Sequence, residues 1–384
     1  MKARRAVNIE DLRQIARRRL PRLAFDYLEG GVEDEACLVR NRQAFEHYRL
    51  VPRYLVDIST RDQSATLFGR TYASPFGIAP TGMAGFLRRG GDELLAEAAA
   101  AADIPFVLSG SSNASIEAIA RTAPRHAWCQ LYAARDPKIT HDLIRRARDA
   151  GLETLVVTVD VPVRPKRERD IRNGFGASPT PGAWVLIDML LHPAWLAVIA
   201  RHGIPRFDSW AAYAGPDARA LDVAKLVSSQ FPAPQTWQDL ETYRRLWPGK
   251  LVVKGILHPD DARRAARAGA DGVIVSNHGG RQLDCAPSPL EAFPAIRDAV
   301  GDQLVLMLDS GVRRGADVLK AVALGARFVF VGRAPLYGVV AGGLAGAQRA
   351  IEILREEIDL VMAQLGCRSL ADLTATALCA TGSS

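Results

Sequence analysis

The sequence LVVKGILHPDDARRAARAGADGVIVSNH, residues 251–278, contains two short apolar runs separated by a helical pattern. The runs are Leu251–Lys254 and Val273–Ser276, and both are rich in valine and isoleucine. Buried strands of a parallel sheet have this composition, and a helix normally connects one such strand to the next. The segment therefore predicts one strand–helix–strand unit of an α/β protein.

The same alternation extends in both directions from Pro75 to the last third of the chain. Eight apolar runs are present, and eight parallel strands with intervening helices predict a (β/α)8 TIM barrel. An open doubly wound sheet is the alternative, but no strand is followed by the G-x-G-x-x-G turn of a dinucleotide site, so the barrel is favoured. The predicted strands are Phe76–Ala79, Phe106–Leu108, Trp128–Tyr132, Thr154–Val159, Leu251–Lys254, Val273–Ser276, Leu304–Leu308 and Phe328–Val331.

Residues 1–74 precede the barrel of residues 75–384 and predict an N-terminal helical extension. The helical patterns are Asn8–Leu20, which ends at a proline, Arg22–Glu29, which ends at Gly30-Gly31, and Glu33–Ala44.

A long stretch, residues 161–235, separates the fourth and fifth strands and exceeds an ordinary βα loop, so it predicts a lid or binding element. Within it, residues 183–200 (AWVLIDMLLHPAWLAVIA) are apolar, but Asp188, His192 and Pro193 interrupt them. One clean membrane-spanning helix is therefore excluded. Two interpretations stay open: the segment lies on a membrane surface, or it packs on the barrel or on a neighbouring subunit.

Composition limits the classes of function. Lys plus Arg exceed Asp plus Glu by 49 to 42, a net charge of +7 that suits anionic substrates, phosphate groups or an acidic membrane, or is simply a solvated basic surface. Five cysteines and seven histidines lack metal-ligand spacing, so no metal is predicted, and the basic residues form no nucleic-acid motif. The cysteine usage and a polar N-terminus without an apolar signal predict a cytoplasmic location.

Polar residues stand at the carboxyl end of every predicted strand. In a TIM barrel these ends form the active site, so the pattern predicts an enzyme. They are Pro80-Thr81, Ser109, Gln130 with Tyr132, Thr158 with Asp160, Lys254, Asn277-His278, Asp309-Ser310-Gly311 and Gly332-Arg333.

The segment Ser276–Asp284, SNHGGRQLD, resembles the signature of the FMN-dependent 2-hydroxy-acid dehydrogenases and oxidases. The resemblance covers nearly the whole chain and implies an FMN cofactor and oxidation of a 2-hydroxy acid to the 2-oxo acid. Further matching motifs, in the family's order, are Phe25-Asp26-Tyr27, Gln130-Leu131-Tyr132, Thr158-Val159-Asp160, Val253-Lys254-Gly255, Asp309–Gly315 and Gly332-Arg333.

By this resemblance His278 is the catalytic base, a role that suits an imidazole because it gains and loses a proton near neutral pH. Asp160 would orient the imidazole, although an aspartate at a strand end also serves as a loop cap. Arg167 and Arg281 would bind the substrate carboxylate as planar forks, and Tyr27 and Tyr132 would add hydroxyl groups to the catalytic and binding set. Without the family motif, Arg167 would be one more charge in a solvated basic run.

The resemblance also implies the residues that bind FMN. Lys254 would face the flavin ring, which becomes anionic on reduction, and the loops after the last two strands would bind the phosphate. The complete predicted set is Ala79, Pro80, Thr81, Ser109, Gln130, Thr158, Lys254, Ser276, Asp309, Ser310, Gly311, Arg313, Gly332 and Arg333.

Three segments resemble the mandelate branch of the family: Asp26–Glu35, Leu108–Ile116 and Gln282–Pro289. Plant glycolate oxidases have tryptophan where Ser111 stands, so a roomier pocket and an aryl substrate, (S)-mandelate, are predicted. L-Lactate is the alternative substrate. Gly82 replaces an alanine of many oxidases, which favours a dehydrogenase that passes electrons to a quinone or another carrier over an oxidase that uses oxygen.

Other classes remain as alternatives. FMN-dependent isomerases and nucleotide dehydrogenases share the phosphate site but need no arginine pair, and a non-catalytic flavin-binding barrel needs no base. The resemblance further implies a homotetramer, and an apolar surface segment would place the protein on the inner face of the cytoplasmic membrane.

Overall fold

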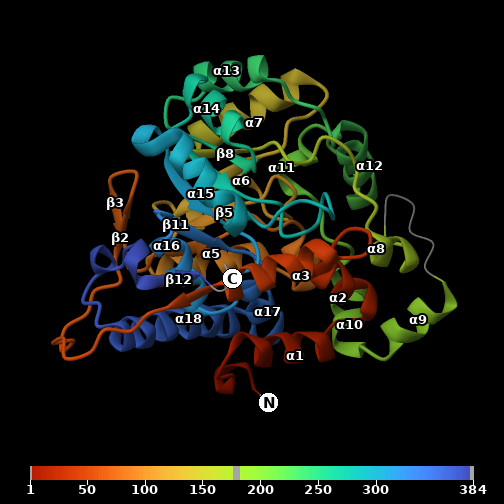
Figure 1. Cartoon of the computed structure of the whole chain (residues 1–384). Helices are drawn as coiled ribbons and strands as arrows, with labels where there is room; N and C mark the ends of the chain where they lie inside the picture. Colours follow the sequence, from red (N-terminus) through yellow and green to blue (C-terminus); the bar gives the residue numbers. More distant parts are fainter. Residues whose placement is uncertain (1, 176–181, 381–384) are drawn as a thin grey trace.

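The computed structural model describes residues 2–175 and 182–380. Its centre is a closed barrel of eight parallel strands in the order β10-β11-β4-β5-β6-β7-β8-β9, which confirms the predicted TIM barrel (Figure 1). The strands are β4 Phe76–Ile78, β5 Phe106–Leu108, β6 Ala127–Leu131, β7 Thr154–Thr158, β8 Lys250–Ile256, β9 Gly272–Val275, β10 Val305–Leu308 and β11 Phe328–Val331.

Two strands match their predicted bounds, and β8 differs most, because it continues past Lys254 to Ile256. The extension passes through Gly255, which has a φ of +107°. A Cβ atom at this position would lie 2.6 Å from Cβ and Cγ of Asp160. Glycine therefore lets β8 pass close to the end of β7, where the sequence places a candidate active-site carboxylate.

Helices surround the barrel and bury its outer surface, while a second apolar cluster fills the interior with side chains such as Trp128, Met307, Phe328 and Phe330. This interior is a packed core, as expected for the fold. The barrel helices and short connecting helices are α4 Ala84–Leu87, α5 Gly91–Ala101, α6 Ile116–Thr122, α7 Pro137–Asp149, α13 Trp237–Leu246, α14 Pro259–Arg267, α15 Pro289–Val300, α16 Gly315–Ala323, α17 Arg333–Gly342 and α18 Leu344–Leu365.

The N-terminal region contains α1 (Ile9–Arg19), α2 (Arg22–Glu29) and α3 (Ala36–Gln43). The third helix begins later than predicted, because Glu33 and Glu35 adopt positive φ angles of 48° and 63°. Its first turn is capped from a distant part of the chain: the carboxylate of Asp284 accepts hydrogen bonds from the N–H groups of Ala36 and Cys37. Single turns of 3-10 helix lie at Ala3–Arg5, Ala44–His47, Gly301–Gln303, Leu370–Asp372 and Ala375–Ala377.

The same region also contains strands, which the sequence analysis did not predict. A hairpin of β2 (Ala65–Leu67) and β3 (Arg70–Tyr72) belongs to the apolar cluster of the barrel interior and closes one end of it. A further strand, β1 (Tyr48–Leu50), pairs with the C-terminal β12 (Leu378–Ala380). Residues 1–74 are therefore helical only in their first part.

The long segment between β7 and β8 forms short helices, and residues 176–181 within the predicted stretch 161–235 lie outside the described residues. The predicted apolar segment forms two helices, α9 (Ala183–Leu190) and α10 (Pro193–His202), which lie beside α2 (Figure 1) and bend by 99° at their junction. In the described part of the chain no single helix has the length and apolar character to cross a membrane. The other helices of the segment are α8 Glu168–Arg172, α11 Asp208–Ala211 and α12 Ala220–Gln230.

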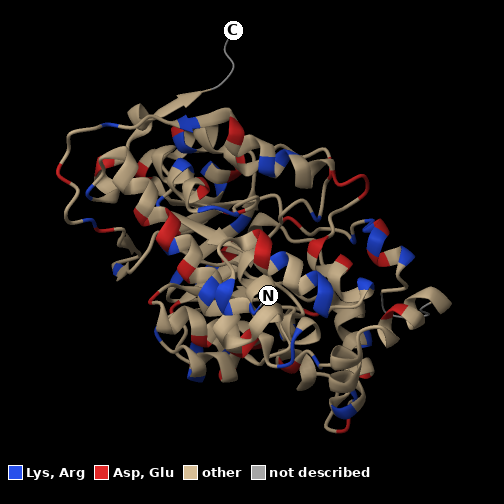
Figure 2. Ribbon diagram, turned by 90° about the horizontal axis from the view of Figure 1, so that it is seen from below, with Lys and Arg blue, Asp and Glu red and all other residues tan. Residues whose placement is uncertain are grey.

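Charged residues of both signs are interspersed over the molecule (Figure 2). The net charge of +7 is thus spread over a mixed surface.

Candidate active site

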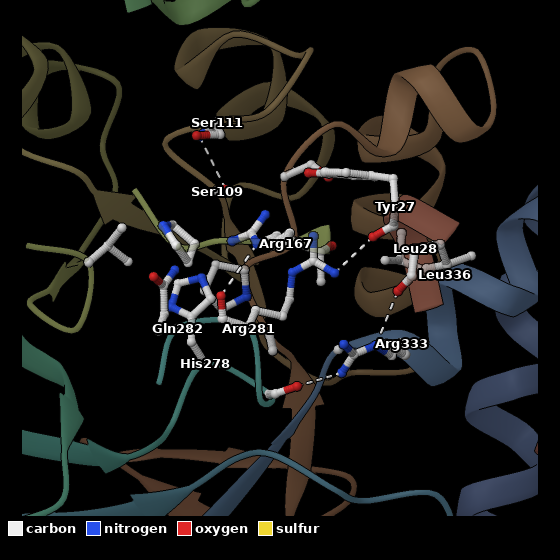
Figure 3. Close-up of a pocket in the computed structure, with 18 of the residues that line it drawn as sticks. Tyr27, Leu28, Ser109, Ser111, Arg167, His278, Arg281, Gln282, Arg333 and Leu336 are labelled. Atoms are coloured by element: carbon white, nitrogen blue, oxygen red, sulfur yellow. Dashed lines mark hydrogen bonds between the residues drawn. The ribbon is translucent and has the colours of Figure 1, made fainter. Parts of the chain in front are cut away.

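A cavity of about 480 Å³ opens at the carboxyl ends of the barrel strands. Most of the predicted site residues project into it, and Figure 3 shows His278, Arg167, Arg281 and Tyr27 around the same space. Four predicted residues, Gln130, Thr158, Asp160 and Ser276, lie behind the wall instead. Those that line the cavity are Tyr27, Ala79, Pro80, Thr81, Ser109, Tyr132, Arg167, Lys254, His278, Arg281, Asp309, Ser310, Gly311, Arg313, Gly332 and Arg333.

His278 is held on both ring nitrogens. Its Nδ1 lies 2.8 Å from Oδ1 of Asp160, and its Nε2 lies 3.2 Å from the hydroxyl of Tyr132. Burial lowers the pKa of His278 and outweighs the attraction of Asp160. Burial opposes the charge of Asp160, but His278 and Lys254 overcome it, so the pKa of Asp160 also lies below its usual value. The pair therefore favours a neutral imidazole beside an ionised carboxylate, which suits a general base.

Arg167 and Arg281 form a cationic pair in the cavity wall. Nη1 of Arg281 donates to the carbonyls of Tyr27 and Gly30 at 2.8 Å each, and its guanidinium lies 5.0 Å from the centre of the Tyr27 ring. Burial, with the like charge of Arg281, lowers the pKa of Arg167 to about 10. Two partly buried guanidinium groups in the wall of one cavity favour an anion there, and a carboxylate matches their geometry.

Lys254 is buried at the base of the cavity and has two partners. Its Nζ donates to Oγ of Ser276 at 2.9 Å and lies 3.3 Å from Oδ2 of Asp309. Burial opposes its charge, but Asp309 and Asp160 raise the pKa of Lys254 above its usual value. The lysine therefore stays charged. The predicted Ser276 thus contacts Lys254 and not the cavity.

The buried polar atoms that have no hydrogen-bond partner among the described residues include Nε2 of Gln130 and Oγ1 of Thr158, which lie near the cavity. The other end of the Gln130 amide is occupied, because its Oε1 accepts a hydrogen bond from the N–H of Gly110 at 2.9 Å. Unsatisfied buried groups are costly, so these atoms call for a polar ligand. The polar edge of an isoalloxazine ring fits these two atoms. The charge of Lys254 suits the same ring.

A second polar region suits a phosphate. The guanidinium of Arg333 donates to the carbonyls of Leu28, Gly30 and Gly279, and burial lowers the pKa of Arg333 to about 9. Gly311 has a φ of +83°, and a Cβ there would lie 2.1 Å from the Asn41 carbonyl, so only glycine fits. Backbone N–H groups beside buried cations bind anions well. The loops after β10 and β11 therefore fit the phosphate of FMN.

Sequence reasoning missed the apolar part of the wall and one carboxylate. Asp170 lines the cavity one helical turn after Arg167, a spacing that could have identified it. The apolar residues lie mostly in the segment between β7 and β8, where no periodic pattern fixes a tertiary position. They include Leu87, Val161, Ile171, Phe175, Val227, Phe231 and Leu336.

A parallel barrel with a His–Asp pair, two arginines in the cavity wall and loops that fit a flavin phosphate defines the class of a flavin-dependent oxidoreductase. The chain belongs to the FMN-dependent dehydrogenase family, whose model matches residues 16–380. The predicted family, FMN cofactor and class of 2-hydroxy-acid dehydrogenases are thereby confirmed.

Three relatives illustrate the similarity. The chain is 44% identical over 368 residues to (S)-mandelate dehydrogenase of Pseudomonas putida, covering 96% of this chain and 92% of the relative. It is 42% identical over 369 residues to an L-lactate dehydrogenase of Caulobacter vibrioides, covering 96% of both. A crystal structure of (S)-mandelate dehydrogenase, described as a monotopic membrane protein, superposes with a TM-score of 0.94 at 42% identity and covers 98% of this chain and 100% of that one.

Proposed function

We propose that this protein oxidises (S)-mandelate, or a similar aryl 2-hydroxy acid, to the 2-oxo acid. The observation that carries the proposal is the placement of His278, which Asp160 holds from behind the wall, beside Arg167 and Arg281 in one cavity with an apolar outer wall. FMN, when bound in this cavity, would supply the acceptor for the two electrons that leave the substrate.

The side chains have separate tasks in this proposal. Arg167 and Arg281 bind the carboxylate and fix the orientation of the substrate, with hydroxyl groups of Tyr27 and Tyr132 beside them. Oxidation of the hydroxy acid releases two electrons and two protons. Nε2 of His278 takes one of these protons, and the other would leave with the electrons to the flavin. Asp160 holds the ring through Nδ1 and stabilises the imidazolium that results.

The apolar wall supports an aryl substrate. Phe231 packs on Tyr132 with ring centres 4.4 Å apart, and Phe175 packs on Tyr27 at 4.9 Å. Ser111 and Gly82 line the same cavity, and their small side chains leave room beside these rings. The identity to (S)-mandelate dehydrogenase supports mandelate, while that to the lactate enzymes keeps L-lactate as the second candidate.

We further propose peripheral contact with the inner face of the cytoplasmic membrane and a quinone or similar carrier as the electron acceptor. Helices α9 and α10 expose apolar side chains, with Trp184 at 82% and Leu191 at 73% exposure. Such a surface suits the interfacial region of a bilayer. The monotopic mandelate dehydrogenase, which has the same fold, supports this placement. A homotetramer stays a proposal drawn from the family.

Anaerobic reduction of the bound flavin tests the function. (S)-Mandelate, (R)-mandelate and L-lactate are added separately while the loss of flavin absorbance at about 450 nm is followed. Rapid loss with (S)-mandelate supports the proposal, and faster reduction by L-lactate moves the substrate to the second candidate. His278→Gln serves as the inactive control, and a flavin that none of the three acids reduces refutes the function.

A further inference from the structure

The loop after β9 holds His278 in an uncommon backbone conformation. His278, Gly279 and Gly280 have consecutive φ angles of +59°, +66° and +74°. A histidine in the left-handed region is energetically unfavourable, so its surroundings must hold it there. The N–H groups of His278 and Gly279 donate to Oγ of Ser276 and Oγ of Ser310, at 3.0 Å each. The N–H of Gly280 is shared between two acceptors of Asn277, its backbone carbonyl at 3.1 Å and its Oδ1 at 3.2 Å.

Asn277 is itself paired with Asn41 of α3. Nδ2 of Asn41 donates to Oδ1 of Asn277 at 2.9 Å, and Nδ2 of Asn277 donates to Oδ1 of Asn41 at 2.6 Å. Asn277 also donates to the carbonyl of Pro287 at 3.1 Å. The two residues are 2% and 4% exposed, so water cannot replace these bonds. Asn277 thus connects α3 to both ends of the loop from 277 to 287.

Other contacts fix α3 against this loop, which makes the helix a rigid support. Asp284 caps the helix, and Arg40 donates to the carbonyls of Asp284 and Ala286 at 3.1 and 2.7 Å. A Cβ at Gly280 would lie 2.9 Å from the N atom of Leu38, so the loop backbone packs directly on the helix. The position of α3 therefore determines the position of the His278 backbone.

We infer that Asn41 and Asn277 are positioning residues, which hold the His278 loop so that its imidazole stays between Asp160 and the substrate. Neither side chain lines the cavity in the described part of the chain, so both act through the backbone. This inference rests on the proposed role of His278 as the base. Displacements of about 1 Å at a reacting group commonly cost ~100-fold in rate.

Asn41→Ala removes the pair and leaves the cavity walls intact. In the FMN-loaded protein, the rate constant of flavin reduction at saturating substrate should fall by about 10- to 100-fold. KM should change less, because Arg281 is anchored separately on Tyr27 and Gly30. Asn277→Ala should lower this rate constant at least as much. The double variant should be no slower than Asn277→Ala, since both substitutions disrupt the same Asn41–Asn277 pair. Val39→Ala, on the exposed face of α3, is the matched control and should match the unmodified protein.

A second readout does not depend on turnover. Nitrogen-15 spectra of labelled histidines in the FMN-loaded protein report His278, whose signals are identified by their loss in His278→Gln. Asn41→Ala should shift these signals, and Val39→Ala should leave them in place. Unchanged His278 signals with an unchanged reduction rate at full FMN occupancy would overturn the inference. If no 2-hydroxy acid reduces the unmodified protein, the proposed function fails, and the inferred catalytic role fails with it. Shifted His278 signals in Asn41→Ala would still establish that Asn41 supports the loop.

Discussion

Oδ1 of Asp160 and Nδ1 of His278 lie 2.8 Å apart, although 118 residues separate them in the chain. The strands that precede them, β7 and β9, flank β8 in the barrel, and Gly255 on β8 allows the approach. Because Nδ1 faces the carboxylate, Nε2 is left facing Tyr132 and the cavity. The pair therefore determines which ring nitrogen of His278 faces the cavity.

Asp160→Asn should lower kcat by about 100- to 10,000-fold, because the amide neither fixes the same tautomer nor stabilises an imidazolium. The base must be neutral, so kcat/KM of the unmodified protein should fall as pH drops through the His278 pKa, which burial places below the ordinary 6.5. The Asp160 carboxylate raises that pKa. Its removal should therefore shift the acid limb of the profile to still lower pH. A pH–rate profile measures both effects, and an acid limb that moves upward would contradict the assignment.

Arg281→Lys should reduce kcat/KM by about 10- to 100-fold, since a lysine keeps the charge but loses the fork that engages a carboxylate. Arg172→Lys is the control, because its side chain is 70% exposed and pairs only with Glu168 among the described residues. Steady-state kinetics with (S)-mandelate measure the difference. Equal values of kcat/KM in Arg281→Lys and the control would exclude carboxylate binding by Arg281.

Arg313→Met should weaken FMN binding by about 10- to 100-fold, because a charged hydrogen bond to the phosphate is lost. The neighbouring Arg314 offers a matched control: its guanidinium pairs with Glu357 at 2.9 Å, and Arg314→Met should retain FMN. Fluorescence of FMN released on dilution gives both affinities. Similar losses in the two variants would mean that Arg313 does not contact the phosphate.

Replacing Trp184 and Leu191 together by serine should abolish binding to lipid vesicles and leave reduction of a soluble dye acceptor unchanged. Both side chains are exposed on the α9–α10 element and do not line the cavity described here. Leu360→Ser, at a 63% exposed position on α18, is the control and should bind vesicles normally. Co-sedimentation with vesicles measures the binding. Unchanged binding of the double variant would refute membrane contact through α9 and α10.

The barrel was predictable from the sequence because each strand is buried on both faces and reads as an unbroken apolar run. The hairpin at residues 65–72 was not predictable, because its strands, ATL and RTY, contain no unbroken apolar run and owe their place to packing against the barrel interior. The start of α3 was also missed. Its cap is Asp284, which no local pattern near Ala36 reveals.

The candidate site likewise contains residues that the sequence predicts and residues that it does not. Residues at strand ends, such as His278 and Lys254, were identified because the fold brings all strand ends together. Ser276 and Asp160 share these ends, but their side chains lie behind the cavity wall, where they contact Lys254 and His278. Phe175 and Phe231 come from the long segment after β7, where tertiary packing alone decides position.

Asp92 should make the folded protein less stable as pH rises. This carboxyl group is buried near the loops after β4 and β5, where it accepts a hydrogen bond from the N–H of Asn113 at 3.2 Å, and burial raises its pKa from 3.8 to about 7. The folded state therefore keeps a proton that the unfolded state has already lost. The resulting stability is fully present below pH ~3.8 and is lost as pH rises through about 7, with a total change of about 4 kcal/mol at most.

Asp92→Asn removes this titration while keeping the shape of the side chain and an acceptor for Asn113. The melting temperature of the variant relative to the unmodified protein should therefore increase between pH 5 and pH 8, because only the unmodified protein must bury a charge at the higher pH. Glu97→Gln changes an exposed carboxylate of the same helix α5 and should show no such trend. Thermal unfolding at both pH values, with FMN saturating, makes the comparison. A difference in melting temperature that stays constant or shrinks as pH rises would mean that Asp92 is ionised in the folded protein. Its hydrogen bonds would then lower its pKa more than burial raises it.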